Sequence, residues 1–327
     1  MVNRARSLFI IGAALLLASC HKDICMDHHH DGMKLNVVFD WTDLNPSTVQ
    51  GMTLLLYPVE GGSPLRFPFS DINGGTISVT SGTYRVLCVN DDELLRLENA
   101  DNWETVSVTT GETELISRSA FNNTRSSIPR AEGTEEEPVL REPPLLYTDT
   151  CTNFYVKATE ETQVLRLTPK MPLGQMHIRV EDISNLQFLQ TVSGAVTGLA
   201  RSLNLTSLKP SDDDCTMPVN LYVTPDNVLE GSLYYFGHCP VLEHAHNLCL
   251  YTMLIDTSKQ ANIYDVTPQL HPDPDPGGGN PGGEPGGEDK NPNILIPALP
   301  LPTPQPAEGG FVLQLDEWNT QSINIKM

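Results

Sequence analysis

Apolar and polar residues alternate along much of this chain, and this period of two limits it to a strand-based fold. Over residues 34–41, for example, Leu35, Val37 and Phe39 occupy every second position. Such spacing places apolar side chains on one face of a strand, whereas a helix needs a period of 3.6. Similar stretches recur about every ten to fifteen residues, with turn residues between them, and no long stretch has helical spacing. The sequence therefore predicts an all-β protein built from β-sandwiches.

Turn residues and prolines set the expected limits of the strands. In the first half we expect strands over residues 34–41, 53–58, 65–69, 76–80, 82–89 and 104–109. In the second half we expect them over residues 153–158, 162–168, 174–183, 217–224, 228–236, 248–256, 262–266, 294–296, 310–315 and 322–327. Residues 190–204 fit either a helix or a strand, a turn and a strand, and Gly194 and Gly198 favour the second interpretation.

Two stretches interrupt the alternation and divide the chain. Residues 122–145 are rich in Pro, Glu, Arg and Ser and have few apolar side chains to bury, so we expect a polar linker. This predicts an N-terminal β-sandwich over residues 34–145, ending in that linker, and a C-terminal β-sandwich over residues 146–327. Residues 271–292 are rich in Gly and Pro and are expected to be a flexible insertion in the second sandwich.

The first twenty residues predict export and lipidation. Arg4 and Arg6 precede a mostly apolar run over residues 8–18, and Leu17-Ala18-Ser19 leads directly to Cys20. A basic start, a short apolar run and small residues at the cut are the layout of a secretory signal peptide. Because a cysteine follows at once, we predict a lipoprotein signal peptide over residues 1–19, acylation of Cys20, and a lipidated tether over residues 20–33. The alternative is an ordinary signal peptide with a chance cysteine.

The negative charge of the chain excludes one class of partner. The full sequence has a formal net charge of −21, and losing Arg4 and Arg6 with the signal peptide leaves the body near −23. Few basic groups are left to neutralise phosphates, so we expect no nucleic-acid partner. The N-terminal lipid is then the expected contact with the membrane. The acidic runs 135–137 and 212–214 are expected to be solvated loops, with a calcium site as the alternative.

Cysteines and histidines supply candidate bridges and metal ligands. Of the seven cysteines, Cys88 and Cys249 lie in apolar runs and are expected to be buried thiols, and Cys215 with Cys239 is the candidate disulfide. Five potential zinc ligands fall within twelve residues: His238, Cys239, His244, His246 and Cys249. Their spacing matches no common zinc finger. The three consecutive histidines 28–30 cannot all face one ion from regular structure. We therefore predict no metal site and no cofactor.

No motif of a common catalytic type occurs in the sequence. It lacks a G-x-S-x-G elbow, an H-E-x-x-H pair and a P-loop, so we expect no catalytic residue and no enzyme activity. Two carboxylates brought together by folding would not be visible at this level. A binding module would need exposed aromatic residues. Trp41 and Trp318 lie in or beside expected strands, which leaves Trp103 as the candidate.

Several stretches resemble a known group of proteins. Cys20 is followed by Cys25 and a histidine run, then by VVFDW, by GTYRVLCVNDD and finally by GGFVLQLDEWNTQSINIKM. Together they resemble a family of Bacteroidales surface lipoproteins of unassigned function, similar to fimbrial anchor and accessory subunits. The resemblance implies two tandem transthyretin-like β-sandwiches, export to the outer membrane and pilin subunits as partners. It carries over one functional position, Cys20, and implies no catalytic residue.

Two functions are therefore expected. The first is a lipid-anchored outer-membrane structural protein, an anchor or assembly subunit of a fimbria that faces the cell surface. A partner's extended segment could add a strand to an open sheet edge of such a protein. The alternative is a surface lipoprotein that binds a glycan or a host protein, with its binding residues left open apart from Trp103.

Overall fold

The structure, a computed structural model, describes residues 32–42, 44–239, 245–271, 291–304, 317–323 and 325. Several sequence predictions lie outside the described residues: the signal peptide, Cys20, nearly all of the tether, His244, the strand over 310–315 and most of the 271–292 insertion. In the described ranges, no helix is long and apolar enough to span a membrane.

Strands dominate the described chain. Those of the first half are β1 (Met33–Phe39), β2 (Met52–Pro58), β3 (Leu65–Phe69), β4 (Gly74–Val79), β5 (Gly82–Asn90), β6 (Leu95–Glu98), β7 (Ser107–Thr110), β8 (Thr148–Val156) and β9 (Gln163–Leu167). Those of the second half are β10 (Gly174–Val180), β11 (Leu189–Ala200), β12 (Ser202–Asn204), β13 (Asp214–Val219), β14 (Tyr222–Val223), β15 (Leu229–Tyr235), β16 (Asn247–Leu254), β17 (Lys259–Asp265), β18 (Asn293–Ile296) and β19 (Trp318–Ile323). A 3-10 turn (Leu186–Phe188) and the short helix α2 (Thr267–Leu270) complete the list.

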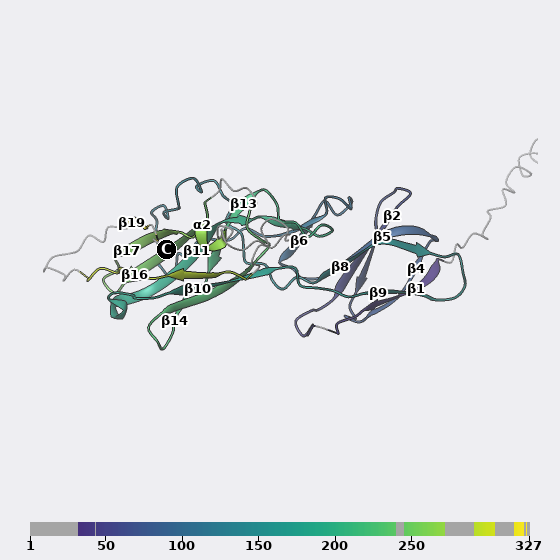
Figure 1. Ribbon diagram of the computed structural model, residues 1–327, viewed down its shortest axis with the longest axis horizontal. Helices are drawn as coiled ribbons and strands as arrows, with labels where there is room; N and C mark the ends of the chain where they lie inside the picture. Colours follow the sequence, from purple (N-terminus) through teal and green to yellow (C-terminus); the bar gives the residue numbers. More distant parts are fainter. Residues whose placement is uncertain are drawn as a thin grey trace, which may run out of the picture.

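The first body is a sandwich of two sheets, on the right of Figure 1. One sheet has the order β4-β1-β9 and the other the order β3-β2-β5-β8. Alternate residues of β1, namely Leu35, Val37 and Phe39, fill the core between the sheets together with Leu54 and Leu56 of β2. This is the alternation that the sequence shows, and the prediction of an all-β sandwich fold is confirmed.

The second body lies on the left of Figure 1 and contains three sheets. Their strand orders are β12-β7-β6, β14-β15-β10-β18 and β13-β11-β16-β17-β19. A single large cluster of apolar side chains holds them together, with Met176 of β10, Val196 of β11 and Leu250 of β16 among its fully buried members. The cluster also includes Leu55 and Leu87, on the outward face of β2 and β5 in the first body. The two bodies therefore share apolar packing where they meet.

The division between the bodies differs from the boundary expected near residue 145. After residue 145, β8 pairs antiparallel with β5 and β9 pairs parallel with β1, so both strands belong to the first body. Before residue 145, β7 pairs with β12 of the second body. The error arose because composition marks an irregular segment but does not show where the chain returns afterwards.

The expected linker is instead a folded cover on the outer face of the five-stranded sheet. We call residues 111–142 the cover segment. Its side chains Leu115, Ile116, Phe121 and Ala131 are buried against a face of β11, β16 and β17. The hydroxyl of Tyr251 in β16 donates a hydrogen bond to the carbonyl oxygen of Pro129 at 2.7 Å. A small number of well-placed apolar residues thus orders a stretch whose average composition is polar.

A half-buried carboxyl, that of Glu137, fastens the same segment to the sheet. Glu137 Oε2 accepts hydrogen bonds from Thr216 Oγ1 at 2.7 Å and from the backbone N of Gly198 at 3.4 Å. Burial nevertheless raises the pKa of Glu137 above its usual value, because the charged form loses solvation. The carboxyl therefore favours the native state most when it is protonated, and that contribution is lost as the pH rises through the raised pKa.

We expect Glu137→Gln to be as stable as the unmodified protein at pH 7, or more stable by up to about 1 kcal/mol. The amide keeps an acceptor oxygen without a charge to desolvate. Below the carboxyl pKa both proteins are neutral at this position, so the advantage shrinks as the pH falls. Urea unfolding at about pH 7 and pH 4 measures this, with the exposed neighbour changed by Glu136→Gln as control. A Glu137→Gln protein that loses several kcal/mol at pH 7 would contradict it.

The cysteine predictions have a mixed outcome. Cys88 and Cys249 are buried free thiols, as expected. Cys215 and Cys239 are also free in the structure, so the candidate disulfide between them is not formed. The thiol of Cys215 points to the carbonyl oxygen of Ala200 at 3.6 Å, and that of Cys239 to the carbonyl oxygen of Asp212 at 3.2 Å.

Candidate functional site

The five-stranded sheet of the second body has one covered edge and one open edge. At the β13 edge, the cover segment pairs with the strand, and the backbone N of Leu140 donates to the carbonyl oxygen of Thr216 at 2.9 Å. At the other edge, β19 runs parallel to β17, from Trp318 opposite Lys259 to Ile323 opposite Tyr264. Among the described residues, β17 is the one strand that pairs with β19. An open edge of this kind can accept a further strand through main-chain hydrogen bonds.

The last described strand is held by one aromatic anchor. Residues 319–322 of β19 are exposed, whereas Trp318 is half-buried. Its ring lies 5.7 Å from that of Phe121 in the cover segment and 5.7 Å from that of Tyr251 in β16. The expected terminal strand therefore exists but begins earlier, at Trp318 instead of residue 322. Most of its length is available on the surface.

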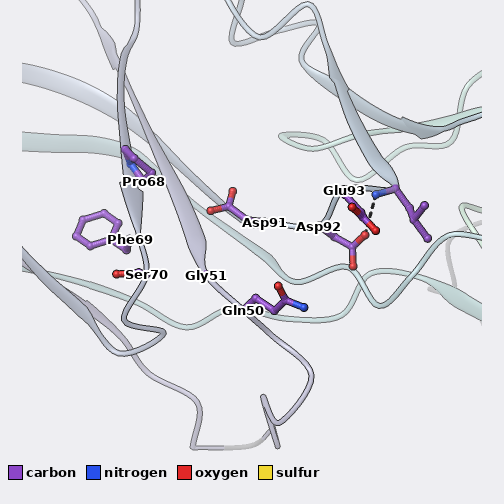
Figure 2. Close-up of a pocket in the computed structure, with 9 residues that line it drawn as sticks. Gln50, Gly51, Pro68, Phe69, Ser70, Asp91, Asp92 and Glu93 are labelled. Atoms are coloured by element: carbon purple, nitrogen blue, oxygen red, sulfur yellow. Dashed lines mark hydrogen bonds between the residues drawn. The ribbon is translucent and has the colours of Figure 1, made fainter.

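A cleft of about 640 Å³ opens at one end of the first body, between the ends of β2, β3 and β5 (Figure 2). Asp91, Asp92 and Glu93 line it. Asp91 Oδ1 accepts a hydrogen bond from Thr53 Oγ1 at 2.6 Å, and Asp92 Oδ1 accepts one from the backbone N of Leu94 at 2.9 Å. Asp92 thus shapes its own turn, whereas Asp91 ties the turn to β2. The described lining residues thus offer mainly carboxylate oxygens as acceptors, with no histidine or lysine beside them.

A second cleft, of about 530 Å³, lies on β10, β14, β15 and β18 of the second body. Arg179 at its floor is ion-paired with Glu181 and Glu230. Two exposed apolar side chains border it, Tyr222 at 60% exposure and Leu295 at 45%. A flat aromatic ring beside paired charges suits a polar ligand with an apolar face. Sequence reasoning missed this site because it searched the tryptophans alone.

Trp103, the candidate contact residue, is half-buried where the two bodies meet. Its ring packs edge-on against Tyr57 of β2 at 5.5 Å, and the guanidinium carbon of Arg85 lies 5.8 Å from its centre. Trp41 is also half-buried, and its Nε1 donates to the carbonyl oxygen of Ile72 at 2.7 Å. These tryptophans therefore join structural elements and do not form an open platform.

Three histidines from separate connections come together in the second body. His238 follows β15, His246 precedes β16 and His271 directly follows α2. Their ring centres are 4.2 Å apart between His238 and His271, 5.0 Å between His246 and His271, and 5.8 Å between His238 and His246. His238 and His246 are buried and His271 is half-buried. Of the ligand group considered from the sequence, His238 and His246 belong to this cluster, and His271 is new. Cys249 lies on the other face of β16, under the cover segment.

Burial and the neighbouring rings keep His246 neutral. Desolvation, followed by the charges of His271 and His238, lowers the pKa of His246 to about 4. Space for this ring comes from Gly198, where β11 bulges with a φ of +73°. A Cβ at Gly198 would lie 2.6 Å from His246 Nδ1, so any larger residue there would displace the imidazole. Gly198, which favoured a turn in the sequence analysis, therefore leaves the space that the His246 ring occupies.

A family model described as a domain of unknown function, DUF5119, matches residues 18–220, more than half of the chain. The chain belongs to the DUF5119 family. The DUF5119 match covers the first body, the cover segment and the second body as far as the residue after β13. His238, His246 and His271 lie beyond it, so the family match says nothing about the histidine cluster.

A curated relative supports the resemblance found in the sequence. A Bacteroides ovatus protein provisionally named fimbrium anchoring subunit Fim4B is 24% identical over 196 residues. The match covers 59% of this chain and 53% of that protein, so it spans about half the length of the relative. The predicted similarity to Bacteroidales fimbrial anchor subunits is confirmed by this match.

A solved structure shares the fold of this DUF5119 protein, and a second has a weaker likeness. A protein from Bacteroides ovatus, described provisionally as an adhesin, has a TM-score of 0.57 and 19% identity, covering 73% of this chain and 84% of its own. The fimbrial anchor protein Mfa2 from Porphyromonas gingivalis has a TM-score of 0.43 and 11% identity, covering 67% and 76%. The first likeness shows a common fold, and the second is too low to carry an argument.

Proposed function

We propose that this protein is a lipid-anchored outer-membrane subunit that anchors or helps to assemble a fimbria at the cell surface. The observation that carries the proposal is the 24% identity over 196 residues to a protein named as a fimbrium anchoring subunit. The adhesin-like fold agrees with it. An anchoring role is structural, and we propose that the protein has no enzyme activity.

The layout of the two bodies supports this role. The first body begins at Met33, thirteen residues after Cys20, so a lipid on Cys20 would hold that body near the membrane. The second body lies at the other end of the described molecule (Figure 1). The open edge of β19 belongs to this more distant body, where a pilin subunit could add a strand without meeting the membrane. The exposed residues 319–322 are the surface that we assign to this contact.

The alternative function is binding of a glycan or a host protein at the surface. The cleft beside Tyr222 and Leu295 favours it, because exposed apolar side chains there border paired charges. Glycan-array binding that disappears in Tyr222→Ala would support this alternative. Trp103→Ala is not a useful probe of binding, since that ring packs between the bodies.

The test is a native pull-down from gently solubilised outer membranes. The affinity tag is inserted after Gly283 in the Gly/Pro tract, so that the terminal strand is left unaltered. We expect a ladder of polymeric pilin to co-purify with the tagged protein. Deleting residues 318–327 removes β19, and we expect the recovered pilin to fall to background while the truncated protein stays in the membrane.

Two comparisons make this result specific. A protein with Asn319, Thr320 and Gln321 replaced by alanine keeps the backbone of β19 and is expected to retain pilin, because strand addition uses main-chain groups. Circular dichroism of the truncated protein checks that the rest still folds. Recovery of the tagged protein without any pilin, from cells that bear fimbriae, would overturn the proposal.

A further inference from the structure

The histidine cluster has the geometry of a metal site. Nε2 of His246 and Nε2 of His271 are 3.0 Å apart, and one ring nitrogen from each of the three histidines lies within 4.8 Å of the others. We propose that His238, His246 and His271 bind one divalent transition-metal ion of the zinc class. The inference is independent of the proposed fimbrial role, and the family match ends before all three residues.

The distances suit zinc coordination. Zinc binds imidazole nitrogen at 2.0–2.1 Å with tetrahedral geometry, which places two such nitrogens about 3.3 Å apart. The 3.0 Å pair is close to that value, and small rotations of the rings would bring the third nitrogen in. Three protein nitrogens leave a fourth position for water.

The ligand set is made of nitrogen alone. Cys239 directs its thiol to the carbonyl oxygen of Asp212 at 3.2 Å, and burial raises the pKa of Cys249 to about 11 on the other face of β16. An all-imidazole set favours zinc, copper(II) or nickel(II) over calcium or magnesium, which prefer oxygen. The chemistry therefore points to a borderline transition metal, and zinc is the probe to use.

A bound ion would join three separate connections of the second body. His238 lies at the end of β15, His246 at the start of β16 and His271 at the end of α2, after β17. A metal that binds the folded state and not the unfolded chain stabilises it by mass action. The site would thus hold together both ends of the β15–β16 connection and the start of the Gly/Pro tract.

The test has to separate this cluster from the histidines near the N-terminus. His21, His28, His29 and His30 also bind zinc in principle, so all four are changed to Ser in a background variant. The mature, lipidated chain is purified in detergent, stripped with a chelator and titrated with Zn²⁺ by calorimetry. Co²⁺ absorbance reports tetrahedral nitrogen coordination directly. His271→Gln in the same background removes one ligand at a half-buried position.

We expect the background variant to bind one Zn²⁺ per chain and to melt at a higher temperature with zinc than without it. His271→Gln is expected to weaken binding at least about 100-fold, since even loss of an outer-shell partner costs 10–100-fold. It should also abolish the Co²⁺ band while leaving the melting temperature in chelator unchanged.

His238→Gln repeats the test from a second ligand, in case His271→Gln is unstable in chelator. A background variant that binds no zinc would overturn the proposal and leave the three rings as a hydrogen-bonded cluster. Unchanged zinc affinity in a folded His271→Gln or His238→Gln protein would overturn it as well, because the ion would then lie elsewhere.

Discussion

Changing Cys20 to Ala, behind the signal peptide of a soluble secreted protein, is expected to move the protein from the membrane fraction to the soluble fraction. The body has a net charge near −23, which opposes binding to anionic lipid, and in the described ranges no helix is apolar enough to span a bilayer. The lipid is then the one anchor that we propose. Each buried CH₂ contributes about 0.8 kcal/mol, so several acyl chains on one residue bind the membrane firmly. Without them, we expect almost all of the protein to leave the membrane.

The measurement combines membrane fractionation with palmitate labelling. The foreign signal peptide removes the apolar run over residues 8–18, which could hold an uncleaved chain in the membrane by itself. Cys25→Ala, with the native signal peptide, is the matched control, since it removes a thiol five residues further along the same leader. It is expected to keep both the label and the membrane location. A Cys20→Ala protein that still carries palmitate would show that another residue is acylated.

Changing Phe121 to Ala is expected to destabilise the second body by about 3–5 kcal/mol, the usual cost of deleting a fully buried phenylalanine ring. Phe121 is 1% exposed and packs in the cluster between the cover segment and the five-stranded sheet. Its ring also supports Trp318 at the start of β19. If the chain around Phe121 were not packed on the sheet, the same change would cost less than about 1 kcal/mol.

Urea unfolding measures this cost, and limited trypsin digestion locates it. Tyr155→Ala is the control, because that aromatic ring is 58% exposed and its loss is expected to cost less than about 0.5 kcal/mol. Arg130 is a suitable reporter for trypsin, since its Nη2 donates to Thr216 Oγ1 at 2.8 Å and ties the cover segment to β13. Cleavage there should accelerate in Phe121→Ala and not in Tyr155→Ala. Equal stability of the two variants would argue against a packed cover segment.

Local alternation predicted the strands well, because period two reports one buried face. The strand expected over residues 65–69 is β3, and the strand, turn and strand expected over 190–204 are β11 and β12. One strand was missed, β6 (Leu95–Glu98). Leu95 and Leu97 do alternate with Arg96 and Glu98, but the stretch is only four residues long and none of them is buried. The ends of the strands were predicted less accurately than their presence. For example, β8 begins at Thr148 and not at residue 153.

Contacts between residues far apart in the chain could largely not be predicted from the sequence. Parallel pairing of β1 with β9 joins positions about 130 residues apart, and nothing local in either strand marks the partner. The histidine cluster is a similar case. His238 and His246 were recognised as potential ligands, but their spacing was compared only with that of zinc fingers. His271 was not considered, because it lies further along the chain beside the Gly/Pro tract. Gly198, in the middle of a strand pattern, was the local signal that a neighbour needed space.

The path of the chain between the two bodies has a mechanical consequence. The chain crosses from the first body to the second between β5 and β6, returns before β8 and crosses again between β9 and β10. In the proposed anchoring role, a pull between a lipid on Cys20 and a pilin subunit on β19 would be shared by these three crossings, reinforced by the apolar cluster that includes Leu55 and Leu87. In two domains joined by a single linker, each domain would carry the full force. Here the three crossings and the shared apolar cluster tie the two bodies together, so we expect them to resist traction jointly.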